Sequence, residues 1–282
     1  MRAAGLIRTG AVFALNAPAE EPDPPLFGRA RFTHEVTGQP GGTSHDDLLH
    51  SWNTQSSSQW DGFRHIGHPV HGHYGGVADE DHGMHHWAAR GLAGRAIVAD
   101  VGRWRAAEGR PLAYDEPDPI EPDDVVACLA AQGTTVEDGD VLLLRTGWLG
   151  WYRTLDDDTR RGMATEFASP GLRPGIPTAA MLWDLHVSAV AADNPALELW
   201  PVGSLAEGDW RAAVRDDRSR TPEFFVHTAL LPLLGLPIGE LFDLDALAEA
   251  CAAEGRHEAF FTSAPLRVHA GVASPPNALA IL

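Results

Sequence analysis

Short apolar runs predict the buried strands of a sheet. The runs cover residues 96–101, 141–144, 187–192 and 259–262, and residues 266–269 are predicted as a further, last strand. Each run has the length of a strand, and the run at 141–144 lies between Gly139 and Gly147. Runs this short and this apolar are typical of strands that are buried inside a protein.

Two segments carry the signals of a helix. Pro122 stands at the first position of one predicted helix, and Gly133 ends it, because proline fits a first helical turn and glycine fits the residue after the last turn. Asp243 is a candidate N-cap for a second helix over residues 244–254, which a glycine ends. Strand and helix signals alternate without a linker, so we expect one α/β domain over residues 1–282, built around a mixed sheet.

The N-terminal fifty residues give weaker signals. Residues 6–12 predict a pair of short strands around a turn, because Arg8 and Gly10 interrupt the apolar run that a signal peptide needs. We therefore expect a cytoplasmic protein. Residues 17–26 are rich in proline and predict an extended connection. Residues 40–47 predict a loop with a helix start at its end.

The charge balance and the cysteine count exclude several classes of protein. Lys and Arg number 21 against 39 Asp and Glu, which gives a formal net charge of −18. A chain this acidic repels phosphate backbones, so we expect no nucleic-acid partner. No stretch approaches the ~20 apolar residues of a spanning helix, so we expect no membrane insertion. Cys128 and Cys251 are too few for a disulfide scaffold and fit buried thiols in a reducing compartment.

Histidines are concentrated in one part of the chain. Nine of the 14 lie between residues 45 and 86, and histidine is both the commonest metal ligand and the side chain that titrates near neutral pH. His68, His71 and His73 lie in a glycine-rich loop, for which we favour a solvated lid over a ligand site. Enrichment alone is weak evidence for a site, and the order of residues within this window is more informative.

The segment at residues 53–65 reads NTQSSSQWDGFRH and resembles a metal-binding signature. That signature, His-x-Gly-Thr-His-x-Asp-x-Pro-x-His, is typical of the cyclase-type metal-dependent hydrolases, the family of bacterial kynurenine formamidase and isatin hydrolase. Its first two histidines fall on Gln55 and Gln59, its aspartate on Asp61 and its last histidine on His65. The chain thus retains the aspartate and the last histidine but has glutamine in place of both leading histidines.

Further segments resemble the same family in the same order. They are residues 94–104, 139–148, 192–201 and 265–282. His227 and Glu240 resemble the family's downstream histidine and glutamate. Together these matches imply the swivelling β/β/α fold of the family, a single domain with a mixed sheet.

The resemblance implies a metal site and an acid–base group. In the family, the leading histidines and the aspartate hold a divalent metal, and the aspartate with the downstream pair can hold a second. Here Asp61, His227 and Glu240 are the expected ligands, helped by Gln59. A glutamine oxygen is a weaker ligand than imidazole, so this oxygen-rich set suits manganese or magnesium better than zinc, and both manganese and zinc stay open as cofactors. His65 occupies the family's acid–base position.

Two groups of residues leave alternatives open. Gln55 and Gln59 are either ligands or donors to a substrate carbonyl, or they only bridge backbone groups across a turn. The tryptophans at positions 60, 87, 148 and 151 belong to the core or to the wall of a pocket. An indole-lined pocket suits a flat aromatic or cyclic substrate.

The expected activity is hydrolysis of a small cyclic or acyl amide, ester or lactone by metal-assisted attack of water. His65, Asp61 and Gln55 are the expected catalytic residues, with His65 as the acid–base group. The alternative is a cyclase or dehydratase that closes a ring in a small-molecule pathway, and a third possibility is a scaffold that has lost catalysis. We expect a small-molecule substrate, and the resemblance also implies a homodimer or homotetramer.

Overall fold

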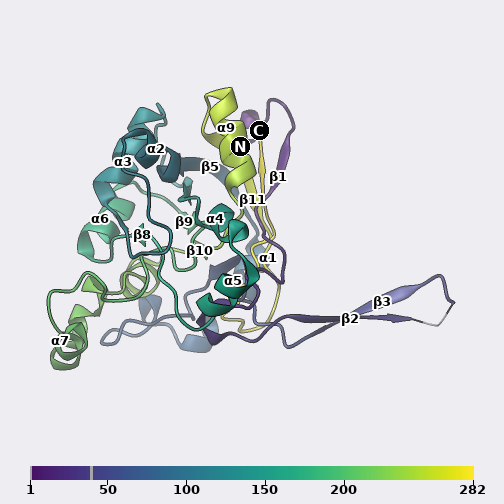
Figure 1. The fold of residues 1–282 in the computed structure, drawn as a ribbon, viewed down its shortest axis with the longest axis horizontal. Coiled ribbons are helices and arrows are strands. Elements are labelled where there is room, and N and C mark those ends of the chain that lie inside the picture. The colour runs from purple at the N-terminus through teal and green to yellow at the C-terminus, as the bar shows by residue number, and fades with distance from the viewer. Residues whose placement is uncertain (1, 39–40) are drawn as a thin grey trace.

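A computed structural model describes residues 2–38 and 41–282 (Figure 1). The strands of its main sheet are β1 (Val12–Ala14), β4 (Gln59–Asp61), β5 (Leu92–Asp100), β7 (Val141–Arg145), β9 (Ala189–Ala192), β10 (Ile238–Glu240), β11 (Glu258–Ser263), β12 (Ala273–Ser274) and β13 (Ala278–Ile281). Within the described residues they lie in the order β1-β13-β11-β5-β7-β9-β10-β4-β12. Neighbours among β5, β7, β9 and β10 are parallel, and the other neighbours are antiparallel. The predicted α/β architecture with a mixed sheet is confirmed.

Helices cover both faces of this sheet. The α-helices are α1 (His85–Arg90), α2 (Val101–Ala107), α3 (Pro122–Ala131), α4 (Trp148–Thr154), α5 (Asp157–Met163), α6 (Ile176–Asp184), α7 (Trp210–Asp216), α8 (His227–Ala229) and α9 (Asp245–Glu254). Short 3₁₀ turns lie at Arg2–Leu6, Leu26–Gly28, Tyr74–Gly76, Asp79–His82 and Arg218–Glu223, and a π-helical turn at Leu230–Leu234 continues α8. Among the described residues, every helix is too short or too polar to cross a membrane.

The central strands are apolar throughout because both of their faces are buried. Ile97 and Ala99 of β5 pack in one core with α2, α3 and α6, whereas Ala96 and Val98 pack in a second core with α9. Successive side chains of a strand point to opposite faces of a sheet. The strands predicted from apolar runs at 96–101, 141–144, 187–192 and 259–262 are therefore confirmed. Strand β5 begins four residues earlier than predicted, and the other ends differ by at most two residues.

Both predicted helices are present. At the start of α3, Glu121 and Asp124 form a reciprocal capping box around Pro122. Helix α9 begins at Asp245, and the expected N-cap, Asp243, does not cap it. The carboxylate of Asp243 instead accepts a hydrogen bond from Arg153 at 2.7 Å.

Two strand predictions are wrong. Residues 266–269 form a turn, in which the N–H of Val268 donates to the carbonyl of Leu266 at 2.9 Å. The N–H of Leu266 is held by the Ser274 hydroxyl at 2.7 Å and does not join a ladder. Residues 6–12 do not form a strand pair either, because consecutive N–H groups at Thr9 and Gly10 both donate to the carbonyl of Leu282, at 3.1 and 2.7 Å.

The helix start expected at the end of residues 40–47 is not present, and these residues belong to a β-hairpin. Residue 40 lies outside the described residues. Strand β2 (Thr33–Gly38) pairs antiparallel with β3 (His45–His50), and Figure 1 shows this hairpin projecting away from the main sheet. Backbone pairing along six positions holds the segment extended. A shorter parallel pair, β6 (Pro119–Ile120) with β8 (Gly171–Leu172), lies outside the main sheet as well.

Candidate functional site

The register between β4 and β10 places three polar side chains on one face of the sheet. Gln59 lies opposite Glu240, and Asp61 lies opposite Ile238. Trp60, between the two polar residues of β4, points to the other face and packs in the α9 core. Gln59 and Asp61 are fully buried, and the Gln59 amide donates a hydrogen bond to the Glu240 carboxylate.

His227 enters the same site from the first residue of α8. Its Nε2 lies 3.1 Å from Glu240 Oε1 and 3.7 Å from Asp61 Oδ2. Its Nδ1 lies 2.7 Å from Oε1 of Glu198. The backbone N–H of His227 donates to the same Oε1 at 3.2 Å, and that of Val226 donates to Oε2 at 2.7 Å. Glu198 is fully buried. Its bond to Nδ1 aims Nε2 of the imidazole at Asp61 and Glu240.

Gln55 and His65 complete the site from the loops on either side of β4. The Gln55 amide donates to Asp61 Oδ1 at 2.9 Å and lies 3.2 Å from His65 Nδ1. His65 Nε2 lies 3.9 Å from Asp61 Oδ2. The His65 side chain is 22% exposed, whereas Asp61 is inaccessible, so His65 connects the buried carboxylate with solvent. The structure therefore brings together Gln55, Gln59, Asp61, His65, His227 and Glu240.

The serines that replace the family's Gly-Thr pair hold the loop before β4. The Ser57 hydroxyl donates to the carbonyl of Pro18 at 2.8 Å. Ser58 donates to the carbonyl of Leu241, next to Glu240, and accepts the N–H of Ala17 at 2.8 Å. These bonds connect the motif to the residue after β10 and to the N-terminal segment.

Burial and neighbouring charges shift the pKa values of these groups in different directions. Burial, with the Asp61 charge, raises the pKa of Glu240 to about 7. Burial alone would raise the pKa of Asp61, but His65 and His227 outweigh it and lower that pKa. Burial lowers the pKa of His65, so its imidazole is neutral at pH 7. Burial disfavours the charged form of His227 too, yet the three surrounding carboxylates raise its pKa well above the usual value.

Asp61, His227 and Glu240 fit a divalent metal. One ligand atom from each lies within 4.8 Å of the others, and all three residues are buried. Among the described residues, Asp61 Oδ2 and Gln59 Oε1 are buried without a hydrogen-bond partner, which is unusual in proteins and is explained where such atoms coordinate an ion. Oxygen atoms dominate this set, and oxygen-rich sites favour manganese or magnesium.

Two other histidines of the enriched segment, His68 and His73, stabilise loops. His68 is buried, and its Nδ1 accepts the N–H groups of Val70 and His71 at 3.1 and 3.2 Å. His73 Nδ1 lies 3.0 Å from the carbonyl of Phe63. His68 therefore does not belong to a solvated lid, because its ring organises the turn from inside.

The tryptophans and cysteines are placed largely as the sequence indicates. Trp60 and Trp148 are fully buried in the core, and Trp87 lines a groove of about 650 Å³ together with Phe63. Burial raises the pKa of both cysteine thiols, Cys128 and Cys251, to about 12. Thiols with such a pKa are unreactive at neutral pH, which agrees with their expected structural role.

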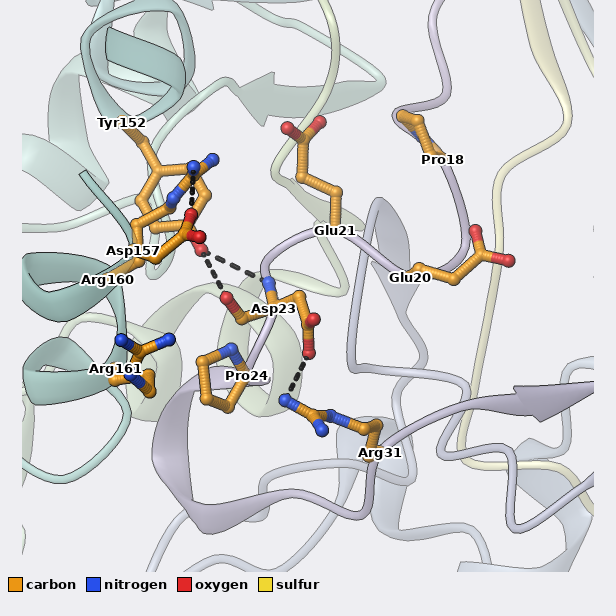
Figure 2. A pocket seen from close by; sticks show the side chains of 10 residues that line it. All are labelled: Pro18, Glu20, Glu21, Asp23, Pro24, Arg31, Tyr152, Asp157, Arg160 and Arg161. Carbon is orange, nitrogen blue, oxygen red and sulfur yellow. Dashed lines mark hydrogen bonds and ion pairs between the residues drawn. The ribbon is translucent and has the colours of Figure 1, made fainter. Parts of the chain in front are cut away.

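A pocket of about 340 Å³ beside α5 is separate from the candidate site (Figure 2). Two ion pairs lie among its lining residues, Asp23 with Arg31 and Asp157 with Arg160, both at 2.7 Å. The Tyr152 hydroxyl accepts the N–H of Asp23 at 3.1 Å. Among the described residues, none of its lining side chains has a buried polar atom without a hydrogen-bond partner, which distinguishes it from the site around Asp61.

Comparisons with known proteins bear on the family and the fold of the chain. A family model described as "Putative cyclase" matches residues 13–199. A crystal structure described as a novel cyclase superposes with a TM-score of 0.81 at 28% identity and covers 100% of this chain and 91% of its own. The predicted swivelling β/β/α fold class is thereby confirmed.

More distant structures share the fold. Isatin hydrolase A from Labrenzia aggregata, bound to benzyl benzoate, has a TM-score of 0.62 at 16% identity and covers 99% of this chain and 94% of its own. A predicted metal-dependent hydrolase from Bacillus stearothermophilus has a TM-score of 0.51 at 12% identity. The match covers 97% of this chain and 98% of the hydrolase chain. No curated protein sequence matches the chain.

Proposed function

Because the chain belongs to the cyclase family, we propose that it is a metal-dependent hydrolase of small amides, esters or lactones. The observation that carries the proposal is the buried group of Asp61, His227 and Glu240 with His65 beside it. Structures with this fold are named isatin hydrolase and metal-dependent hydrolase, which supports the same class of reaction here.

Asp61, His227 and Glu240 would hold the metal, with Gln59 Oε1 as an additional neutral oxygen. A divalent ion bound there supplies a positive charge that polarises a substrate carbonyl and lowers the pKa of a bound water. With three oxygen donors and one nitrogen donor, the ligand set favours manganese over zinc. Glu198 holds the His227 ring so that Nε2 faces the carboxylates.

His65 would move the proton. Its imidazole is neutral at pH 7 because burial lowers its pKa, and its side chain reaches solvent. A neutral imidazole takes a proton from the attacking water and returns it to the leaving nitrogen or oxygen. Gln55 contacts both His65 and Asp61, so it would orient these two groups.

The test combines metal analysis with a panel of substrates. Protein purified without added metal should contain close to one manganese or zinc per chain by elemental analysis. It should hydrolyse at least one cyclic or acyl amide, ester or lactone, and a chelator should abolish that turnover. Ring closure or dehydration that persists in chelator would instead favour the cyclase alternative. Absence of both metal binding and turnover would favour a scaffold.

A further inference from the structure

A groove of about 650 Å³ presents apolar side chains at the edge of the main sheet where the parallel strands begin. It is lined by the first residues of three of these strands and by three aromatic rings, namely Leu92 of β5, Val141 of β7, Ala189 of β9, Phe63, Trp87 and Phe261. We call it the Trp87 groove. Apolar surface of this kind marks places where proteins bind one another, and aromatic rings and arginine are enriched there.

The charge of the Trp87 groove differs from that of the chain as a whole. Arg90 and His86, both exposed residues of α1, line it, and among the described residues no carboxylate does. The chain has 39 acidic and 21 basic residues, so a surface of this size without an acid is unusual. Arg64 and Arg95 each pair with a carboxylate, whereas Arg90 has none within 4.0 Å in the part of the chain that the structure describes. The groove therefore combines apolar surface with an uncompensated positive charge.

The β2–β3 hairpin has the complementary chemistry. Its two strands contain three acidic residues and no lysine or arginine. Val36 lies opposite Asp47, and His34 lies opposite Leu49. Because side chains alternate along a strand, Val36, Leu49 and Asp47 share one face of the hairpin. All three are more than half exposed, so this face offers two apolar side chains with a carboxylate beside them.

The hairpin cannot cover this face within one chain. Figure 1 shows it projecting away from the main sheet, at whose edge the Trp87 groove lies. A two-stranded hairpin without further packing is marginally stable in water. Both complementary surfaces belong to the same chain, so two copies related by a two-fold axis make the contact twice and close the assembly.

We propose that two copies of the chain exchange their hairpins, and that the face formed by Val36, Asp47 and Leu49 lies in the Trp87 groove of the other copy. Val36 and Leu49 cover the aromatic rings, and Asp47 pairs with Arg90. The hairpin runs directly into the motif segment at residues 53–65, and Phe63 of the groove belongs to the same segment. The exchange thus joins the motif segments of the two copies. The inference does not depend on the proposed function.

The test reverses the two charges of the proposed pair. Analytical ultracentrifugation at micromolar concentration should show an oligomer for the wild-type protein. Arg90→Asp and Asp47→Arg should each raise its dissociation constant by about 100-fold or more, because each reversal brings like charges together at both contacts. An equimolar mixture of the two variants should reassociate, since every groove then meets a hairpin of opposite charge. The protein with both substitutions should also associate.

Control variants make the result specific. Glu35→Arg reverses a charge on the opposite face of the hairpin and should leave association unchanged. Thermal unfolding reports whether each variant is folded, and Arg90→Gln and Asp47→Asn replace any reversal that is not, with an expected loss of about tenfold. The inference is overturned if the wild-type protein is a monomer, if a folded variant at Arg90 or Asp47 associates normally, if Glu35→Arg dissociates the protein equally, or if neither the mixture nor the double variant associates.

Discussion

His227 Nδ1 and Glu198 Oε1 lie 2.7 Å apart in a fully buried contact. The same carboxylate accepts two backbone N–H groups at the start of α8, so the helix and the ring are fixed together. A histidine that donates one ring N–H to a carboxylate presents the other nitrogen as a ligand in a defined direction. Here that direction leads to Asp61 and Glu240.

Glu198→Gln is therefore expected to weaken manganese binding by about 10- to 100-fold, the usual effect of removing a group that orients a ligand. The change keeps the shape of the side chain but removes the charge that stabilises the Nδ1 proton. Calorimetric titration of the metal-free protein with manganese measures the effect. Glu249→Gln, at a surface carboxylate that pairs with Arg103, serves as the control. Equal affinities in the two variants would contradict the role of Glu198.

Asp61→Asn is expected to abolish metal retention and turnover together. The asparagine oxygen can still accept the hydrogen bond from Gln55, but the charged ligand is lost. Elemental analysis after gel filtration measures retention, and thermal unfolding reports whether the protein remains folded. Asp79→Asn, which disturbs only the contacts of Arg64 and His73, should keep its metal. A folded Asp61→Asn protein with full metal content would exclude Asp61 as a ligand.

His65→Gln is expected to lower turnover by about 10²- to 10⁴-fold while metal content stays the same, because proton transfer is lost. The wild-type rate should rise with pH and level off by neutral pH. The base form of His65 is the active one, and burial lowers its pKa below the usual value of 6.5. His71→Gln should change turnover little. Full activity in His65→Gln would mean that another group moves the proton.

The ligand residues could be predicted because the motif places them. Asp61, His227 and Glu240 were found through resemblance, and strand pairing between β4 and β10 brings them together. Glu198 was missed as a functional residue, although the segment 192–201 was recognised. Its role depends on where α8 begins, and no local pattern shows that a carboxylate 29 residues earlier lies beneath that helix start.

The hairpin was missed for a related reason. A polar segment around 40–47 has turn-forming residues whether it joins two strands or precedes a helix. Backbone pairing with β2 makes residues 45–50 a strand. The turn-forming residues before them do not indicate whether such a partner strand exists.

The hairpin leads to a prediction about assembly. Val36 and Leu49 share one face of β2–β3, as the register shows, and both are more than half exposed. An isolated two-stranded hairpin is marginally stable in water, so we expect a second copy of the chain to cover this face in a homodimer or homotetramer. Light scattering at micromolar concentration should show the oligomer.

Lysine at both apolar positions, Val36→Lys with Leu49→Lys, should shift the protein toward monomer. The matched control places two lysines on the opposite face, at Glu35 and Thr37, and should keep the oligomer. Metal content should be normal in both variants, since the hairpin lies outside the Asp61 site. A monomeric wild-type protein, or equal dissociation of both variants, would contradict the prediction.

Gln59→His tests whether this chain binds its metal differently from relatives with the full histidine motif. Gln59 Oε1 is buried without a hydrogen-bond partner among the described residues, and an imidazole there would replace a weak oxygen donor by nitrogen. Because zinc prefers nitrogen ligands more than manganese does, the ratio of zinc to manganese affinity should rise by about tenfold or more. Competition titration measures that ratio, and Gln59→Leu, which removes the oxygen without adding a ligand, should weaken manganese binding. If neither variant changes metal affinity, Gln59 only holds Glu240 in place through its amide, and the ligands are Asp61, His227 and Glu240 alone.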